Sequence, residues 1–252
     1  MTVLPAIEAR LLWTQRHMAG LRKLLDEYEQ MPPYTVSTEV DEDAQTRVIR
    51  ATLTVPPPVE ISLALGDVAH QLRAVLDNAV GAMSDAGPTR RSAFVITRDP
   101  RKFDEACEDG RLTGLPSGVL AFVRSVQPFP GAGTFGERVG DGLERLDELA
   151  QHDRHRAILL RGAVVRAEGV EVMQPVEAVQ PPESLGITWT GQAEVRIPVN
   201  VTALPFFRVH VFVAEEDARI RGWEVDGLVQ LVTQSVVAVA QGMAAATASD
   251  PP

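Results

Sequence analysis

The stretch Gly66-Asp67-Val68-Ala69-His70-Gln71-Leu72-Arg73-Ala74-Val75-Leu76-Asp77-Asn78 lies within the clearest helical pattern of the chain. Between residues 60 and 83 the apolar side chains recur at intervals of three and four, at Leu65, Val68, Leu72, Val75, Leu76, Ala79 and Met83. This spacing places them on one face of a helix. The sequence therefore predicts a long amphipathic helix over residues 60–83, with its apolar stripe in the core.

The opposite face of this helix is polar. Residues three, four and seven apart share a helical face. Asp67, His70, Ala74 and Asp77 therefore form a row, and Arg73 lies along its edge. A histidine beside carboxylates can be oriented for general acid–base catalysis, and an arginine can hold an anionic or phosphoryl group. The same pattern is typical of a solvated face, or of an ion-paired network that docks a neighbouring segment.

A second polar cluster, Asp153-Arg154-His155-Arg156, lies where a predicted helix ends and a predicted sheet begins. One interpretation is a set of junction residues, since arginine cations are favoured near the C-terminus of a helix. We expect the two clusters to converge in a small polar pocket or a structural joint, with His70, Arg73 and Asp77 meeting His155 and Arg156. The candidate catalytic residues are His70, Arg73, Asp77 and His155, and the candidate binding residues are Asp67, Asn78, Asp153 and Arg156.

Two motifs carry a resemblance to known proteins. Gly-Asp-x-x-His-x-Leu-Arg-x-x-Leu-Asp at residues 66–77 and Asp-x-His-Arg at 153–156 resemble a family of uncharacterised bacterial proteins. That family has Gly-Asp-x-x-His-x-Leu-Arg-Ser-x-Leu-Asp-His on a helix, with Asp-Lys-His-Arg downstream. The similarity covers about residues 7–156 and implies no established activity. The chain departs from the pattern at Ala74, where the family has Ser, and at Asn78, where it has His.

The same helix is remotely similar to the motif of HEPN-type ribonucleases, which is an arginine, four residues and then a histidine. Those helical proteins cut RNA without a metal ion. The equivalent positions here are Arg73 and Asn78, and an asparagine cannot exchange a proton near neutral pH. The resemblance therefore implies an inactive copy, or one that uses His70 or His155 instead.

The rest of the chain predicts an α+β fold. A helix over residues 5–30 ends at Pro32-Pro33, and two strands at 34–39 and 47–55 flank an acidic turn as a β-hairpin would. A short strand is predicted at 94–97, a helix that opens at Asp99 at 100–109, and another helix at 119–126. A flexible, glycine-rich connection at 130–142 then leads to a helix at 142–151. Strands at 157–167, 170–179, 186–199 and 206–214 predict an antiparallel sheet, covered by a helix at 225–246. We expect one domain, with a helical half at 1–151 and a sheet half at 152–252.

Composition excludes several classes of function. The 34 acidic and 24 basic residues give a net charge of −10, which repels nucleic acid and anionic membranes. The single cysteine, Cys107, excludes an intrachain disulfide and multi-cysteine zinc sites, and acidic neighbours make it a poor nucleophile. The glycines form no phosphate loop, and no serine lies in a Gly-x-Ser-x-Gly elbow. The spacing of His152, Asp153 and His155 could suit a metal ion, but we favour a frayed helix end and expect neither metal nor cofactor.

The sequence leaves two functional classes open. The first is a binding or interaction protein whose His/Arg/Asp network joins the helical half to the sheet. The second is a metal-independent hydrolase or degenerate HEPN-like ribonuclease that acts on phosphate esters through His70, Arg73 and His155. We expect a cytoplasmic protein, because residues 1–25 lack the apolar run of a signal peptide and residues 228–246 suit a core helix better than a membrane span. The final helix could also provide a homodimer contact.

Overall fold

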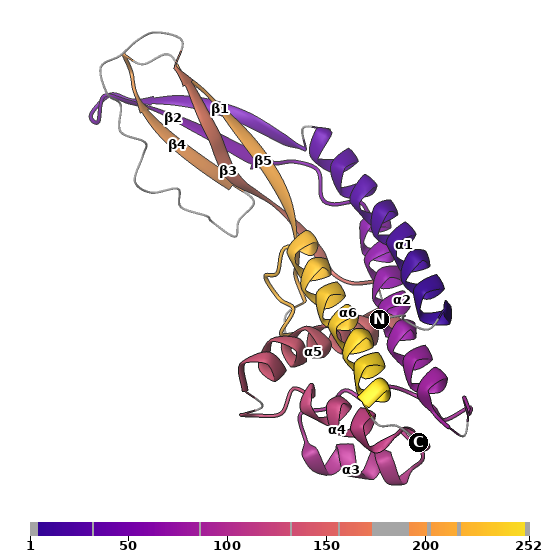
Figure 1. Ribbon diagram of the computed structural model, residues 1–252. Helices are drawn as coiled ribbons and strands as arrows, with labels where there is room; N and C mark the ends of the chain where they lie inside the picture. Colours follow the sequence, from indigo (N-terminus) through magenta and orange to yellow (C-terminus); the bar gives the residue numbers. More distant parts are fainter. Residues whose placement is uncertain are drawn as a thin grey trace.

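A computed structural model describes residues 5–31, 33–85, 87–131, 133–155, 157–172, 192–200, 203–215 and 218–249. The helices are α1 (Pro5–Gln30), α2 (Val59–Met83), α3 (Pro100–Glu108), α4 (Ser117–Ser125), α5 (Gly133–His155) and α6 (Val225–Ser249). The strands are β1 (Tyr34–Asp41), β2 (Thr46–Leu53), β3 (Leu160–Val172), β4 (Gln192–Pro198) and β5 (Ala203–Val213). Figure 1 shows the strands gathered in an arm that projects from a body made of the helices.

Helices α1 and α2 lie alongside each other and match the predicted periodicity closely (Figure 1). The predicted apolar stripe of α2 is buried along its whole length. On α1 the buried side chains Ile7, Thr14, Leu21 and Tyr28 recur every seven residues, as expected for a helix that packs along another helix. Asp99 caps α3 as predicted, since its side chain accepts a hydrogen bond from the N–H of Arg101.

The prediction of a flexible connection at residues 130–142 is wrong. Helix α5 begins at Gly133, and two of its glycines lie where other elements approach closely. A Cβ added to Gly140 would lie 2.8 Å from the Cα of Pro128, and one added to Gly142 would lie 2.1 Å from the Oγ of Ser235 on α6. These glycines therefore serve close packing, whereas the sequence suggested freedom of the backbone.

Residues 94–97 also differ from the prediction, because they belong to no strand in the described part of the chain. Their main chain pairs with side chains instead of with another strand. The N–H of Phe94 donates to the Oδ1 of Asp77 at 2.8 Å, and the N–H of Thr97 donates to the Oε1 of Gln127 at 3.0 Å. An extended segment can satisfy its polar groups in this way without a ladder.

The described strands form two antiparallel sheets, ordered β1-β2-β4 and β3-β5. The N-terminal hairpin thus shares a sheet with β4, since buried Val195 lies opposite buried Ile49 and continues its apolar face. The predicted break between strands at 157–167 and 170–179 is replaced by one strand, β3, with register shifts at 164–166 and 168–170. Residues 173–191, where parts of two predicted strands fall, lie outside the described residues.

Helix α6 packs along α2, α4 and α5, and it meets the strands at β5. It carries no charged residue between Asp226 and Ser249, as expected for a helix with neighbours on several sides. Within the described chain it is the one helix long and apolar enough to span a membrane by length and composition, a test that a core helix also passes. The mixed α+β class is confirmed, with a helical N-terminal half that carries a hairpin, then strands and a final helix.

The close approach of Pro128 to α5 predicts that Gly140→Ala destabilises the protein. The new Cβ would overlap main-chain atoms that cannot rotate away, so the free energy of unfolding should fall by about 1–3 kcal/mol. Gly20→Ala is the matched control, because a Cβ there meets nothing within 4 Å and should stabilise α1 by about 1 kcal/mol. Urea unfolding of both variants measures the difference, and equal stabilisation by both would show that α5 does not pack as described.

Candidate functional site

The two motifs meet at Gly66, where the carboxylate of Asp153 lies against the backbone of α2. A Cβ added to Gly66 would lie 2.0 Å from the Oδ1 of Asp153, so a side chain at this position excludes that placement. One helical turn further on, the Nε2 of His70 lies 2.8 Å from the Oδ2 of Asp153. The side chain of His70 is 41% exposed and that of Asp153 is 17% exposed. The pair thus joins the last turn of α5 to the middle of α2 at the edge of the protein surface.

Arg73 points into the protein, and its side chain is 16% exposed. Its guanidinium donates a hydrogen bond to the carbonyl of Phe94 and lies 3.6 Å from the Oδ1 of Asp147 on α5. Its Nε is 3.9 Å from the Oδ1 of Asp77. The carbonyl binds the cation and the two carboxylates lie near it at ion-pair distance, although its buried Nη1 forms no hydrogen bond in the described structure. A ligand anion would have to compete with these two carboxylates.

Asp77 completes a two-point clamp on one peptide segment. Its Oδ1 accepts the N–H of Phe94 at 2.8 Å, and Arg73 binds the carbonyl of the same residue. The ring of Phe94 is fully buried in the core. Residues Arg73 and Asp77 therefore hold the main chain beside a buried aromatic side chain, and each removed partner would leave a polar main-chain group without its bond.

The end of α5 is also tied to the strands. The Nδ1 of His152 lies 3.8 Å from the Oε2 of Glu215, a residue that follows β5 and is 2% exposed. Glu215 accepts the N–H of Leu159 at 2.7 Å, and the Oγ of Ser62 on α2 donates to the carbonyl of Ile158 at 2.6 Å. The segment between α5 and β3 is thereby bound to α2 on one side and to the exit of β5 on the other.

Some predicted residues stand apart from this network. Asp67 is exposed, and within the described part of the chain the side chains of Asp67 and Asn78 make no hydrogen bond or ion pair. The side chain of His155 and the whole of Arg156 lie outside the described residues. Their contact with His70, Arg73 and Asp77 stays a prediction, while Asp153 is the residue of the second motif that the structure brings to the first.

Three partners were missed at the level of sequence. Nothing in the sequence indicated that Asp147 or the main chain of Phe94 would contact Arg73. A main-chain partner in particular can belong to any residue type. The close contact at Gly66 did have a signal. A glycine inside a strong helical pattern costs about 1 kcal/mol relative to alanine, which indicates a reason such as a close neighbour.

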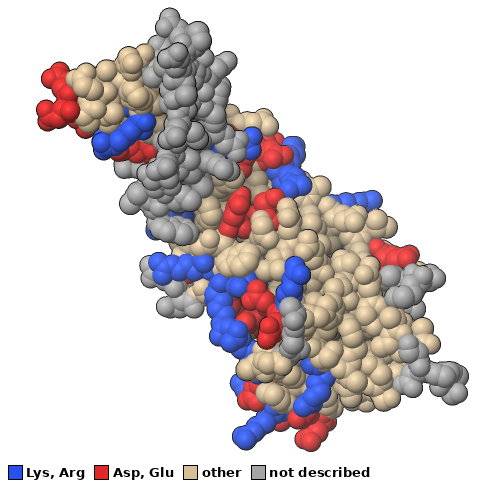
Figure 2. Space-filling view, turned by 60° about the vertical axis from the view of Figure 1, so that its left-hand side comes forward, with Lys and Arg blue, Asp and Glu red and all other residues tan. Residues whose placement is uncertain are grey.

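Charges around the network are paired. On the face shown in Figure 2, acidic and basic side chains lie next to one another. A cavity of about 330 Å³ adjoins Asp147 and has both signs in its lining, from Arg98, Asp99, Lys102, Glu144 and Glu148. Glu144 is bound by Arg98 at 2.5 Å and by Arg219 at 3.0 Å, and burial raises the pKa of Glu148. This cavity presents no uniform field that would select an anion or a cation.

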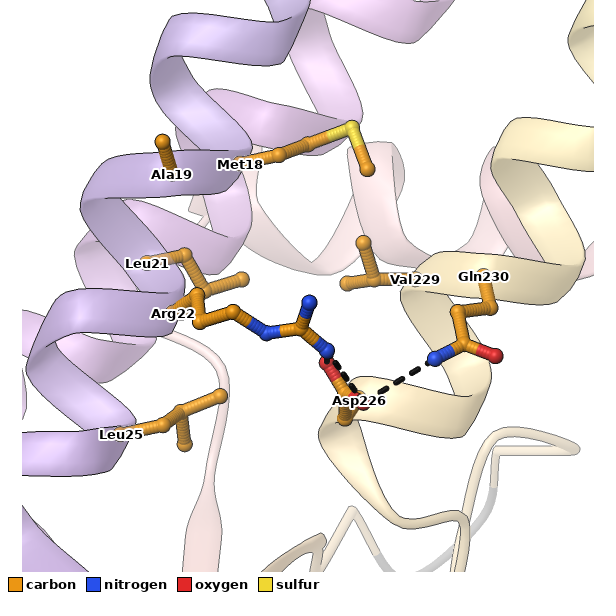
Figure 3. A pocket seen from close by; sticks show the side chains of 8 residues that line it. All are labelled: Met18, Ala19, Leu21, Arg22, Leu25, Asp226, Val229 and Gln230. Atoms are coloured by element: carbon orange, nitrogen blue, oxygen red, sulfur yellow. Dashed lines mark hydrogen bonds and ion pairs between the residues drawn. The ribbon is translucent and has the colours of Figure 1, made fainter.

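A second cavity, of about 290 Å³, lies between α1 and α6 (Figure 3). Met18, Leu25 and Val229 give it apolar walls, and Arg22 crosses its edge to bind Asp226 at 2.9 Å. The motif of α2 contributes no side chain to the described lining. This cavity is therefore separate from the network.

Neither a metal site nor a reactive thiol is indicated. In the described ranges, no group of three or more His, Cys, Asp and Glu residues could hold a metal ion. Burial, and then the charge of Asp104, raises the pKa of the Cys107 thiol. A thiol with a raised pKa has little of the thiolate that nucleophilic attack requires.

Comparisons with known proteins place the chain in no group, because no protein-family model, curated protein or solved structure matches it. The two resemblances drawn from the motifs stay predictions. The chemistry of the site therefore has to be inferred from its geometry.

The contact at Gly66 predicts that the effect of Gly66→Ala depends on Asp153. In the otherwise unchanged protein the new Cβ displaces the carboxylate, and the free energy of unfolding should fall by about 1–2 kcal/mol. In an Asp153→Ala background the obstacle is gone, so the same change should stabilise α2 by about 1 kcal/mol through helix propensity. Urea unfolding of the four proteins gives both values, and an effect with the same sign in both backgrounds would contradict the contact.

The clamp on Phe94 predicts unequal effects of two aspartate substitutions on the same helix. Asp77→Ala leaves the buried N–H of Phe94 without a partner and should lower the free energy of unfolding by about 1–3 kcal/mol. Asp67→Ala is the control, because Asp67 is exposed, and should change it by no more than about 0.5 kcal/mol. Denaturant unfolding compares the variants, and equal losses would mean that Asp77 holds nothing in place.

Proposed function

We propose that this chain is a binding or interaction protein in which the His/Arg/Asp network is a structural joint between the helical body and the strand arm. The observation that carries this proposal is the use of the motif side chains on internal partners. Asp153, in the last turn of α5, engages His70 on α2, and the neighbouring His152 faces Glu215 after β5. Arg73 and Asp77 hold Phe94 within the helical body. A catalytic centre would need such groups to face a space that a substrate can enter.

The position of Arg73 argues further against phosphate chemistry. Catalysis on phosphate esters depends on cations that can stabilise charge on the transferring group. Arg73 is largely buried and binds a carbonyl with a carboxylate beside it. The residue five positions later, which corresponds to the histidine of HEPN-type ribonucleases, is Asn78, and this side chain cannot act as an acid or base. A joint explains the arrangement of these groups within the molecule without any substrate.

The shape of the molecule supports a role in binding. The arm projects from the helical body and carries its strands away from the helices (Figure 1). Val36 and Val40 on β1 are more than half exposed, at 53% and 59%. Exposed apolar side chains on a projecting element are a usual feature of surfaces that bind other proteins.

One observation favours the second candidate function, a metal-independent hydrolase. His70 is partly exposed, and a carboxylate holds one of its ring nitrogens, as in an oriented general base. The two functions differ in what His70 contributes. A joint loses stability when His70 is removed, whereas a general base loses activity.

The proposal predicts that His70→Ala and Arg73→Ala lower the melting temperature. Arg73→Ala should have the larger effect, of several degrees, because it leaves the carbonyl of Phe94 and the carboxylate of Asp147 without their cation. Calorimetry measures the shift, and Asp67→Ala serves as the control. The same proteins are incubated with single-stranded RNA and, separately, with a small phosphodiester. Hydrolysis by the unchanged protein that disappears in His70→Ala, at an unchanged melting temperature, would refute the proposal and establish the hydrolase.

A further inference from the structure

Strand β1 is an edge strand without the usual protection of an edge. Within the described residues β2 is its one hydrogen-bonded neighbour. From Tyr34 to Asp41 it contains no proline and no lysine, and its register with β2 runs without a bulge. Its two carboxylates, Glu39 and Asp41, lie against Arg50 and Arg196 of the same sheet. Prolines, lysines and bulges are the devices that keep edge strands from pairing with other chains. Among the described residues nothing pairs with its outer edge, which can therefore accept another strand.

The main-chain groups that face this open edge can be identified from the ladder. The N–H of Thr54 donates to the carbonyl of Pro33 at 2.7 Å, so Pro33 directs its carbonyl toward β2. In an antiparallel pair this direction alternates from one residue to the next. The N–H and C=O groups of Val36, Thr38 and Val40 therefore point away from β2, toward the open edge.

The side chains of Val36, Thr38 and Val40 lie on the face of the sheet that is buried on β2. Val36 lies opposite Ala51 and Thr38 opposite Ile49, and paired residues share a face. Ala51 and Ile49 are buried, whereas Val36 is 53% exposed. The apolar face therefore continues onto β1, where no described element covers it. In the part of the chain that the structure describes, an unpaired edge and an uncovered face thus coincide at one strand.

We propose that a second copy of this chain adds its own β1 to this edge, antiparallel, about a twofold axis through Thr38. The sequence of β1 is self-complementary in this register. Val36 lies opposite Val40 of the second copy, Thr38 lies opposite its counterpart, and Ser37 lies opposite Glu39 of the second copy. Apolar and Thr–Thr pairs stabilise neighbouring strands, and no like charges are opposed. The edge-facing groups form about six main-chain hydrogen bonds, which gives a continuous sheet ordered β4-β2-β1-β1-β2-β4.

This surface is separate from the network on α2, so the inference does not rest on the proposed function. It also differs from a dimer through the final helix, because α6 lies in the helical body and β1 lies in the arm (Figure 1). Variants of β1 can therefore distinguish the two interfaces without altering either the joint or α6.

The register is tested by oxidative crosslinking in a Cys107→Ser background, which removes the chain's single cysteine. In Thr38→Cys the two thiols face each other across the axis, with Cα atoms about 5.5 Å apart, within the range of a disulfide. In Ser37→Cys the two thiols are diagonal neighbours on the other face, about 7–8 Å apart and out of reach. We expect a covalent dimer from Thr38→Cys at least ten times faster than from Ser37→Cys. Equal rates, or no crosslink in Thr38→Cys, would overturn the proposal.

Sedimentation equilibrium of the full chain provides the second measurement. The unchanged protein should approach twice the chain mass of 27.3 kDa as its concentration rises. Val36→Lys places a charge opposite the apolar Val40 of the second copy and should leave a monomer. Thr35→Lys, on the opposite face of the strand, is the control and should still dimerise. A monomeric unchanged protein, or a Val36→Lys protein that dimerises as well as the control, would exclude pairing through β1.

Discussion

The absence of a Cβ at Gly66 is the constraint on which the arrangement of helices and strands depends. It lets the carboxylate of Asp153 lie against α2 and reach His70. Because Asp153 belongs to the last turn of α5, this contact fixes the point at which the chain leaves the helical body. The neighbouring residue, His152, faces Glu215 after β5. The last turn of α5 thus contacts both α2 and the segment that follows β5. These contacts set the position of the strand arm relative to α2.

Most of the fold followed from local patterns. The departures arose where contacts with distant parts of the chain, which a local pattern does not contain, decide the structure. Helical periodicity placed α1 and α2 within a residue of their ends, because an apolar stripe of 25 residues leaves few alternatives. The glycines within α5 led to a wrong prediction, because a glycine required for close packing looks the same in sequence as one required for flexibility. The apolar composition of α6 showed that it is surrounded, but it could not show that helices rather than strands surround it.

The candidate site was predictable to the same extent. The two motifs come together at His70 and Asp153, a pair that the sequence did not single out. The predicted contact with His155 and Arg156 stays a prediction, because these side chains lie outside the described residues. The partners of Arg73 and Asp77 could not be predicted, since both hold the main chain of Phe94, and main-chain groups are the same in every residue. A polar row on a helix therefore indicated that contacts exist. It did not distinguish a partner within the chain from a substrate.

A double-mutant cycle on His70 and Asp153 tests whether the motifs form a joint. The free energy of unfolding is measured by urea denaturation for the unchanged protein, His70→Ala, Asp153→Ala and the double variant. Two side chains in contact at 2.8 Å should give a coupling energy of about 1 kcal/mol, so that the double variant loses less than the sum of the single losses. Strictly additive losses would mean that the pair does not hold α5 to α2, and the structural role of the network would have to be abandoned.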